Sequence, residues 1–180
     1  MIITTLVPPA GEPVALAEAR TFLRIDYEGE DELVASLTAS GRARTEAETG
    51  LCLVTRTLRL AMARWPVRAL ESGRLELPVR PVSEVLSVTA AGADVTMGFA
   101  LEAGTQPVLR PLSGGFPAAG DGVEITVAAG FGAPEDVPDE LVLAVKMLAA
   151  DAYAGREGDR VRGLSEDVAA LLAPWRRVRL

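Results

Sequence analysis

The sequence predicts an α+β fold: mainly a bundle of about four helices, with a small antiparallel β-sheet inserted in the middle third. Three observations lead to this fold class. Apolar residues recur with a helical period toward both ends of the 180-residue chain, they alternate with polar residues from residue 51 onward, and Gly/Pro clusters separate the alternating segments. We expect one domain over residues 1–174, with helices at about 14–25, 30–50, 138–154 and 165–173, a β region over 51–130, and a tail over 175–180.

The first two helices follow from apolar spacing and from the residues that end them. The segment PVALAEARTFLRID places an apolar stripe at Leu16, Ala19, Phe22 and Leu23. The second helix is expected to end at Gly50 and to carry one apolar side, made of Leu33, Val34, Leu37 and Ala47.

The middle third changes to the period of a strand. A first strand is expected from Val54 to about Trp65, because apolar and polar residues alternate there. Shorter strands are expected over 74–77, 82–89, 99–102, 108–112 and 123–128.

Helical spacing returns after Pro138, which suits the first turn of a helix. The expected core face of that helix is Leu141, Val142, Val145, Leu148 and Ala149. Ser165 is a suitable cap for a last short helix that Pro174 would stop.

The charge balance argues against a protein that grips DNA. The chain has 25 acidic and 18 basic residues, a net charge of −7, whereas a DNA-binding surface needs basic residues to neutralise phosphates. Three of the arginines fall within the last five residues, so an acidic body carries a small basic tail. No apolar run is long enough to span a membrane, and we expect a soluble protein made in the cytoplasm.

The residues that most often carry catalysis are scarce. Histidine is absent, Cys52 and Lys146 are single, and neither a phosphate-binding loop nor a zinc motif is present. The acidic pairs lie where helices begin, and the helix dipole explains them there. We therefore expect no enzyme and no catalytic, cofactor-binding or metal-binding residue, with a small carboxylate-dependent enzyme as the alternative.

The C-terminus has the composition of a docking peptide. Tryptophan and arginine are the residue types that anchor interfaces, and they follow the last helix stop directly. The candidate partner-binding residues are Trp175, Arg176, Arg177, Arg179 and Leu180. A frayed tail that is basic by chance is the alternative.

Five blocks of the sequence form a pattern through their order and spacing. The first has the pattern L-x-E-A-[KR]-x-x-L-R-[IV]-D, at Leu16, Glu18, Ala19, Arg20, Leu23, Arg24, Ile25 and Asp26. The others are the helix end Thr49-Gly50, LELPVRPVSEVLSV with Leu77, Pro78 and Pro81, VEITVAAGFG followed by VPDELVLAV, and the ending LLAPWR. Together these blocks resemble the head–tail connector (adaptor) family of long-tailed phages and gene transfer agents. Residues 91–121 correspond to none of the blocks.

The resemblance implies a structural subunit of a virion or phage-like particle, assembled in the bacterial cytoplasm. It implies a ring, usually twelvefold, in the neck between the portal and the tail, around the channel through which DNA leaves without specific binding. The implied partners are the portal protein, a tail-side neck protein and other copies of the chain, with no cofactor and no membrane; the isolated subunit could be a monomer. In the family the C-terminal segment reaches toward the portal, so we expect residues 175–180 to dock there. The alternatives are another neck protein, either a head-completion plug or a tail terminator, and the small carboxylate-dependent phage enzyme.

Overall fold

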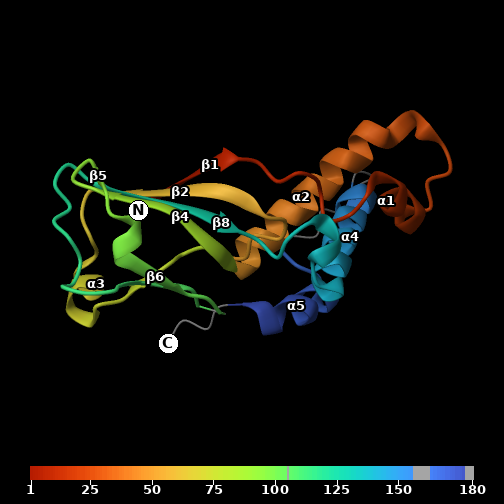
Figure 1. Cartoon of the computed structure of the whole chain (residues 1–180). Coiled ribbons are helices and arrows are strands. Elements are labelled where there is room, and N and C mark those ends of the chain that lie inside the picture. Colours follow the sequence, from red (N-terminus) through yellow and green to blue (C-terminus); the bar gives the residue numbers. More distant parts are fainter. Residues whose placement is uncertain (105, 156–162, 177–180) are drawn as a thin grey trace. The chain divides into compact units, whose positions relative to one another are not determined.

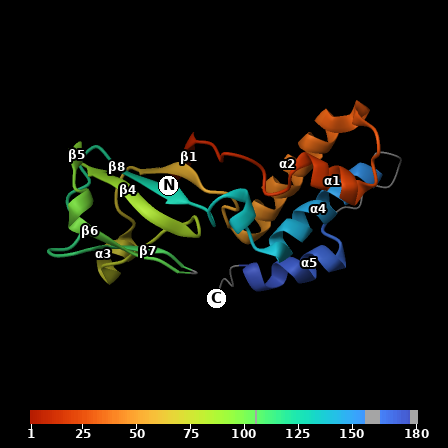
Figure 2. The ribbon, with the colours of Figure 1, turned by 45° about the vertical axis from the view of Figure 1, so that its right-hand side comes forward.

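The computed structural model describes residues 1–104, 106–155 and 163–176. The chain forms two compact units that alternate along the sequence (Figures 1 and 2). The sheet unit comprises Met1–Ala10 and Thr55–Phe131, and the helical unit comprises Gly11–Val54 and Gly132–Leu180. The predicted mixture of helices and antiparallel strands is therefore confirmed.

The helical unit contains two long helices, which pack against each other in antiparallel directions, and two shorter helices. Its helices are α1 (Leu16–Leu23), α2 (Asp31–Thr49), α4 (Asp139–Ala154) and α5 (Glu166–Leu172), with 3-10 turns η1 (Glu28–Glu30), η3 (Pro134–Asp136) and η5 (Ala173–Trp175). Helices α2 and α4 each contact the other three helices, so together they form the centre of this unit. Along α4, four of the five predicted core positions are buried, and Val142 is half-buried. No helix of the described residues is long and apolar enough to cross a membrane.

The buried face of helix α2 agrees only in part with the prediction: Val34 is buried, and Leu33 and Leu37 are half-buried. Its buried residues are Val34, Thr38, Gly41, Thr45 and Thr49, whereas Ala47 is exposed. Each buried threonine donates its hydroxyl hydrogen bond to the carbonyl four residues earlier, at 2.7–3.0 Å. A threonine whose hydroxyl is satisfied within its own helix presents a methyl group outward and can pack almost like valine. The prediction was wrong at Ala47, and it did not include the threonines that complete the buried face.

Gly41 allows α2 and α4 to approach closely. A Cβ atom at this position would lie 2.7 Å from the carbonyl oxygen of Val145, on the backbone of α4. Real Cβ atoms do not approach so near to a backbone atom, so the contact requires glycine in the middle of a helix, where glycine is otherwise unfavourable. The sequence of α2 is therefore set by packing against α4.

The sheet unit contains two antiparallel sheets and one short helix. Its elements are β1 (Ile2–Val7), β2 (Arg56–Met62), α3 (Val67–Ser72), β3 (Leu75–Glu76), β4 (Val82–Ala90), β5 (Ala93–Asp94), the 3-10 turn η2 (Thr96–Gly98), β6 (Phe99–Glu102), β7 (Val108–Pro111) and β8 (Val123–Ala129). The larger sheet has the order β1-β2-β8-β4-β5 and the smaller one β3-β7-β6. The β region is thus larger than the small sheet we predicted.

Besides the two-residue strand β5 and the turn η2, two elements of the sheet unit were not predicted: β1 and α3. Strand β1 pairs with β2 and adds the N-terminus to the sheet, although 48 residues separate Val7 from Arg56. Helix α3 buries only Ala69, so it has no apolar stripe for a periodicity argument to detect. Strand β1 therefore depends on a partner that is distant in the sequence.

The larger sheet buries one face and leaves the other open. On β8, Val123, Ile125, Val127 and Ala129 are at most 1% exposed, and the residues between them face outward. Nearby, Trp65 packs against Phe99 and Phe116 with ring centroids 5.7 and 4.7 Å away. The indole Nε1 of Trp65 donates a 2.7 Å hydrogen bond to the carbonyl of Pro117, which fixes the long 112–120 loop to this core.

Candidate interaction surfaces

The predicted C-terminal docking segment begins on a fixed support. Helix α5 is anchored by Val168 and Leu172, both fully buried, and η5 continues it to Trp175, which is half-buried. Arg44 of α2 donates a 2.5 Å hydrogen bond to the carbonyl of Gly163, just before α5. Of the five predicted docking residues, Trp175 and Arg176 are described, whereas Arg177, Arg179 and Leu180 lie outside the described residues.

Arg176 has a partner within its own unit. Its Nη2 lies 2.8 Å from Oε2 of Glu48, near the end of α2, and both side chains are more than a third exposed. Exposed ion pairs of this kind contribute about 0–1 kcal/mol, because water and salt screen them. Little free energy would therefore be lost if Arg176 left Glu48 to contact a partner protein. Docking by these residues stays a prediction.

A more buried ion cluster involves residues next to two of the three points in the sequence at which the chain passes between the helical unit and the sheet unit. Arg42 of α2 contacts Glu12 through Nε at 2.6 Å and Glu46 through Nη1 at 2.9 Å. The other oxygen of Glu46 accepts a 2.9 Å hydrogen bond from the backbone N–H of Leu53. Burial alone would lower the pKa of Arg42, but the hydrogen bonds and charges of Glu12 and Glu46 outweigh it and raise that pKa. This cluster fixes residues 12 and 53 to α2.

Net charge is distributed very unevenly between the units. The sheet unit has seven arginines and seven acidic residues, whereas the helical unit has 18 acidic and 11 basic residues. The helical unit therefore carries the whole net charge of −7. Identical copies repel each other least where their sheet units meet, because like net charges raise the energy of approach.

Strand β1 is an apolar edge of the larger sheet. All six of its residues are exposed, with Ile2 at 69% and Val7 at 56%, although four of the six are Ile, Leu or Val. The first charged residue of the chain is Glu12, so no charged side chain protects this edge. An exposed apolar edge strand is a ready template for pairing with another chain. Its β-branched composition was the available signal in the sequence, and the sequence interpretation missed it.

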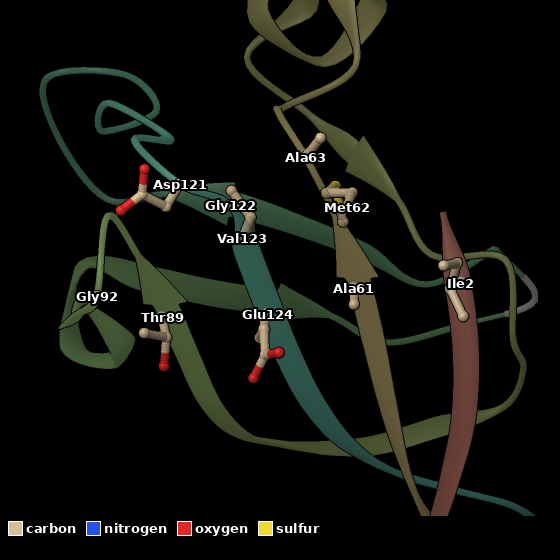
Figure 3. Close-up of a pocket in the computed structure, with 10 residues that line it drawn as sticks. All are labelled: Ile2, Ala61, Met62, Ala63, Thr89, Gly92, Asp121, Gly122, Val123 and Glu124. Carbon is tan, nitrogen blue, oxygen red and sulfur yellow. The ribbon is translucent and has the colours of Figure 1, made fainter.

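A shallow groove of about 460 Å³ runs across the open face of the same sheet. Its central row crosses four strands through paired positions, from Ile2 to Ala61 to Glu124 to Thr89 (Figure 3). The loop residue Asp121 lies at one end. The lining combines small and apolar side chains with the two acids Asp121 and Glu124, and it contains no lysine, arginine, histidine or cysteine. Within the described residues, no cluster of potential metal ligands is found. The groove is suited to contact with another surface.

Two exposed acids of the sheet unit have lowered pKa values. A hydrogen bond from Arg110, at 2.5 Å, is the main cause for Glu102, and Arg74 at 2.9 Å adds to it. The hydroxyl and backbone N–H of Thr96 lower the pKa of Asp94 in the same way. Both arrangements are structural, because they tie neighbouring strands and turns together at the surface.

Comparison with known proteins gives matches among solved structures. No protein-family model and no curated protein matches the chain. A chain in the neck of an empty gene transfer agent (GTA) particle, computed with C6 symmetry, has a TM-score of 0.85 and 29% identity over 100% of this chain and 97% of that one. A chain of the virion of a native GTA particle has a TM-score of 0.85 and 28% identity with the same coverage. A chain in the neck of a native GTA particle, computed with C12 symmetry, has a TM-score of 0.84 and 28% identity, again over 100% and 97%. The chain is therefore similar over its whole length to neck chains of gene transfer agent particles, which supports a structural role in the neck of a virion or phage-like particle.

Proposed function

We propose that this chain is a head–tail adaptor subunit, which forms a ring between the portal and the tail around the DNA exit channel. The observation that carries the proposal is the full-length similarity to neck chains from assemblies with C6 and C12 symmetry. In this role residues 1–174, with both units, act as one connector domain and residues 175–180 as the portal-docking tail. The function is assembly and not catalysis.

The charge distribution supports a subunit that DNA passes without being held. A surface binds duplex DNA non-specifically by neutralising phosphates and releasing counterions, which requires an excess of basic side chains. The helical unit has an excess of seven acidic residues and the sheet unit has no excess of either sign. We expect no measurable binding of duplex DNA by the full chain at about 0.15 M salt.

The first test separates an adaptor from another neck protein. The full chain is mixed in turn with the portal protein and with the tail-tube protein of the same particle, and each mixture is analysed by light scattering after size-exclusion chromatography. A stable complex with the portal supports the adaptor. Binding to the tail tube alone would favour a tail terminator and overturn the adaptor proposal.

The second test addresses the docking tail. Replacing Arg176, Arg177 and Arg179 together by glutamine should weaken portal binding by at least tenfold, since charge-assisted contacts at interfaces contribute about 1.5–3 kcal/mol each. The matched control replaces Arg56, Arg59 and Arg64 of the sheet unit by glutamine, which makes the same change of net charge elsewhere. Equal portal affinity for the two triple variants would show that the tail does not dock.

A single substitution in α2 refines this test. Glu48→Gln removes the charged partner of Arg176 without altering the tail itself. Because the exposed pair is weak, portal affinity should rise by no more than about fivefold. A loss of affinity would instead mean that Glu48 holds the tail in its docking position.

A further inference from the structure

The larger sheet has two open edges, and they are about equally long. One is the outer side of β1, which spans six residues and pairs with β2 on its inner side only. At the opposite end of the strand order lies the two-residue strand β5, which pairs with β4 only at Thr89 and Ala90 and leaves the rest of the outer side of β4 without a neighbouring strand. At Val88 the turn around η2 occupies the outer side, through hydrogen bonds with Val95 and Thr96. Over residues 82–87, no strand of the described chain pairs with the outer side of β4.

The side chains on the two edges are compatible. Strand β1 carries no charge, and Glu84 is the single charged residue over 82–87. Leu86, 44% exposed, gives the β4 edge an apolar side chain to match those of β1. Figure 3 shows the strand of Ile2 at one side of the sheet and the strand of Thr89 at the other, with two strands between them. One edge of the sheet could therefore pair with the opposite edge of an identical sheet.

We propose that β1 of one copy pairs with residues 82–87 of β4 in the next copy, so that the larger sheets continue from subunit to subunit. The inference rests on the proposed ring. Two non-identical surfaces joined head to tail repeat with a constant rotation and can close into a ring, whereas pairing of β1 with β1 would be two-fold and would stop at a dimer. The contact also joins two sheet units that have no net charge, so repulsion between like net charges does not oppose it.

The direct test is disulfide cross-linking on the assembled complex. The double variant Thr4→Cys, Leu86→Cys is mixed with the portal protein, oxidised and analysed on a denaturing gel without reductant. We expect a ladder of covalent multimers, because each copy carries both halves of the contact. Each single variant should remain monomeric, since Cys52 is buried and 8% exposed.

The outcomes distinguish this inference from the adaptor proposal. A portal-bound ring that gives no ladder would overturn the strand pairing and leave the adaptor standing. A dimer from Thr4→Cys alone would also overturn it, because that product requires β1 to meet β1. If the wild-type chain binds no portal, both proposals are overturned together.

A charge variant provides an independent measurement. Ile2→Lys combined with Leu6→Lys places two charges on the edge strand, which natural proteins use to prevent strand addition. We expect ring assembly on the portal to fall at least tenfold, with a melting temperature within a few degrees of wild type because both side chains are exposed. The matched control is Val67→Lys with Leu70→Lys, two apolar residues of helix α3 that are 66% and 54% exposed and lie outside the larger sheet. Equal assembly by the two double variants would contradict the proposal.

Discussion

The two units of this chain are stabilised by different kinds of contact. The helical unit packs helices through a glycine and three internally bonded threonines, fixes its connecting segments with the Arg42 cluster, and carries all of the net charge. The sheet unit buries alternating aliphatic residues, balances its charges and leaves an apolar strand exposed at its edge. In the proposed adaptor role, the acidic unit would not hold passing DNA, and the neutral unit would be the one that contacts other copies.

The Arg42 cluster gives the largest expected difference between the units. Arg42→Met should lower the free energy of unfolding by about 3 kcal/mol, because it leaves two partly buried carboxylates facing each other without a cation. Arg59→Met in the sheet unit should cost less than about 0.5 kcal/mol, since its pair with Glu124 is 3.8 Å long and about half exposed. Urea unfolding of both variants measures the contrast. Equal losses of unfolding free energy would mean that the Arg42 cluster contributes no more to stability than the exposed pair of Arg59 and Glu124 does.

The next largest effect on stability is expected where α2 and α4 approach each other closely. Gly41→Ala should destabilise the protein by about 2 kcal/mol, although alanine normally favours a helix, because the new methyl group would press on the backbone of Val145. The control is Ser40→Ala, on the exposed side of the same helix, which should be neutral or slightly stabilising. Thermal unfolding separates the two. A stabilised Gly41→Ala variant would show that the helices can move apart.

A smaller, stabilising effect is expected at the end of α1. Arg24 occupies the C-cap of this helix with a φ of 56°, in the left-handed region that suits glycine. Arg24→Gly should therefore raise the free energy of unfolding by about 0.5–1 kcal/mol. A loss of stability in urea unfolding would instead reveal a favourable contact of the arginine side chain that outweighs the strain.

The smallest effect concerns the surface acids of the sheet unit. The pKa of Glu102 lies below its ordinary value of 4.5, so its contribution to stability is complete above that value and is lost as the pH falls through the lowered pKa. Glu102→Gln should therefore flatten the dependence of the melting temperature on pH below about pH 4.5 and leave it unchanged near pH 7. If the melting temperature of the variant falls below pH 4.5 as steeply as that of the wild type, the Arg74 and Arg110 contacts do not persist in solution.

Local patterns predict the helical unit better than the sheet unit. Helix α4 could be predicted because its core positions follow one face of a helix, whereas the buried face of α2 could not, since its threonines become apolar surface only after their hydroxyls are bonded internally. Strand β1 forms only against β2, about 50 residues away, and no local signal reports such a partner. Of the candidate docking residues, the sequence could name Trp175 and Arg176, but it could not foresee that Glu48 holds the arginine.

Native mass spectrometry of the chain assembled with the portal protein of its own particle tests the central claim most directly. An adaptor predicts one dominant complex, with a fixed number of copies of this chain that matches the cyclic symmetry of a neck ring, twelve if the ring follows the C12 symmetry of a similar particle. A chain that stays unbound over a range of salt, or that binds the portal in variable numbers without closing a ring, would contradict the account.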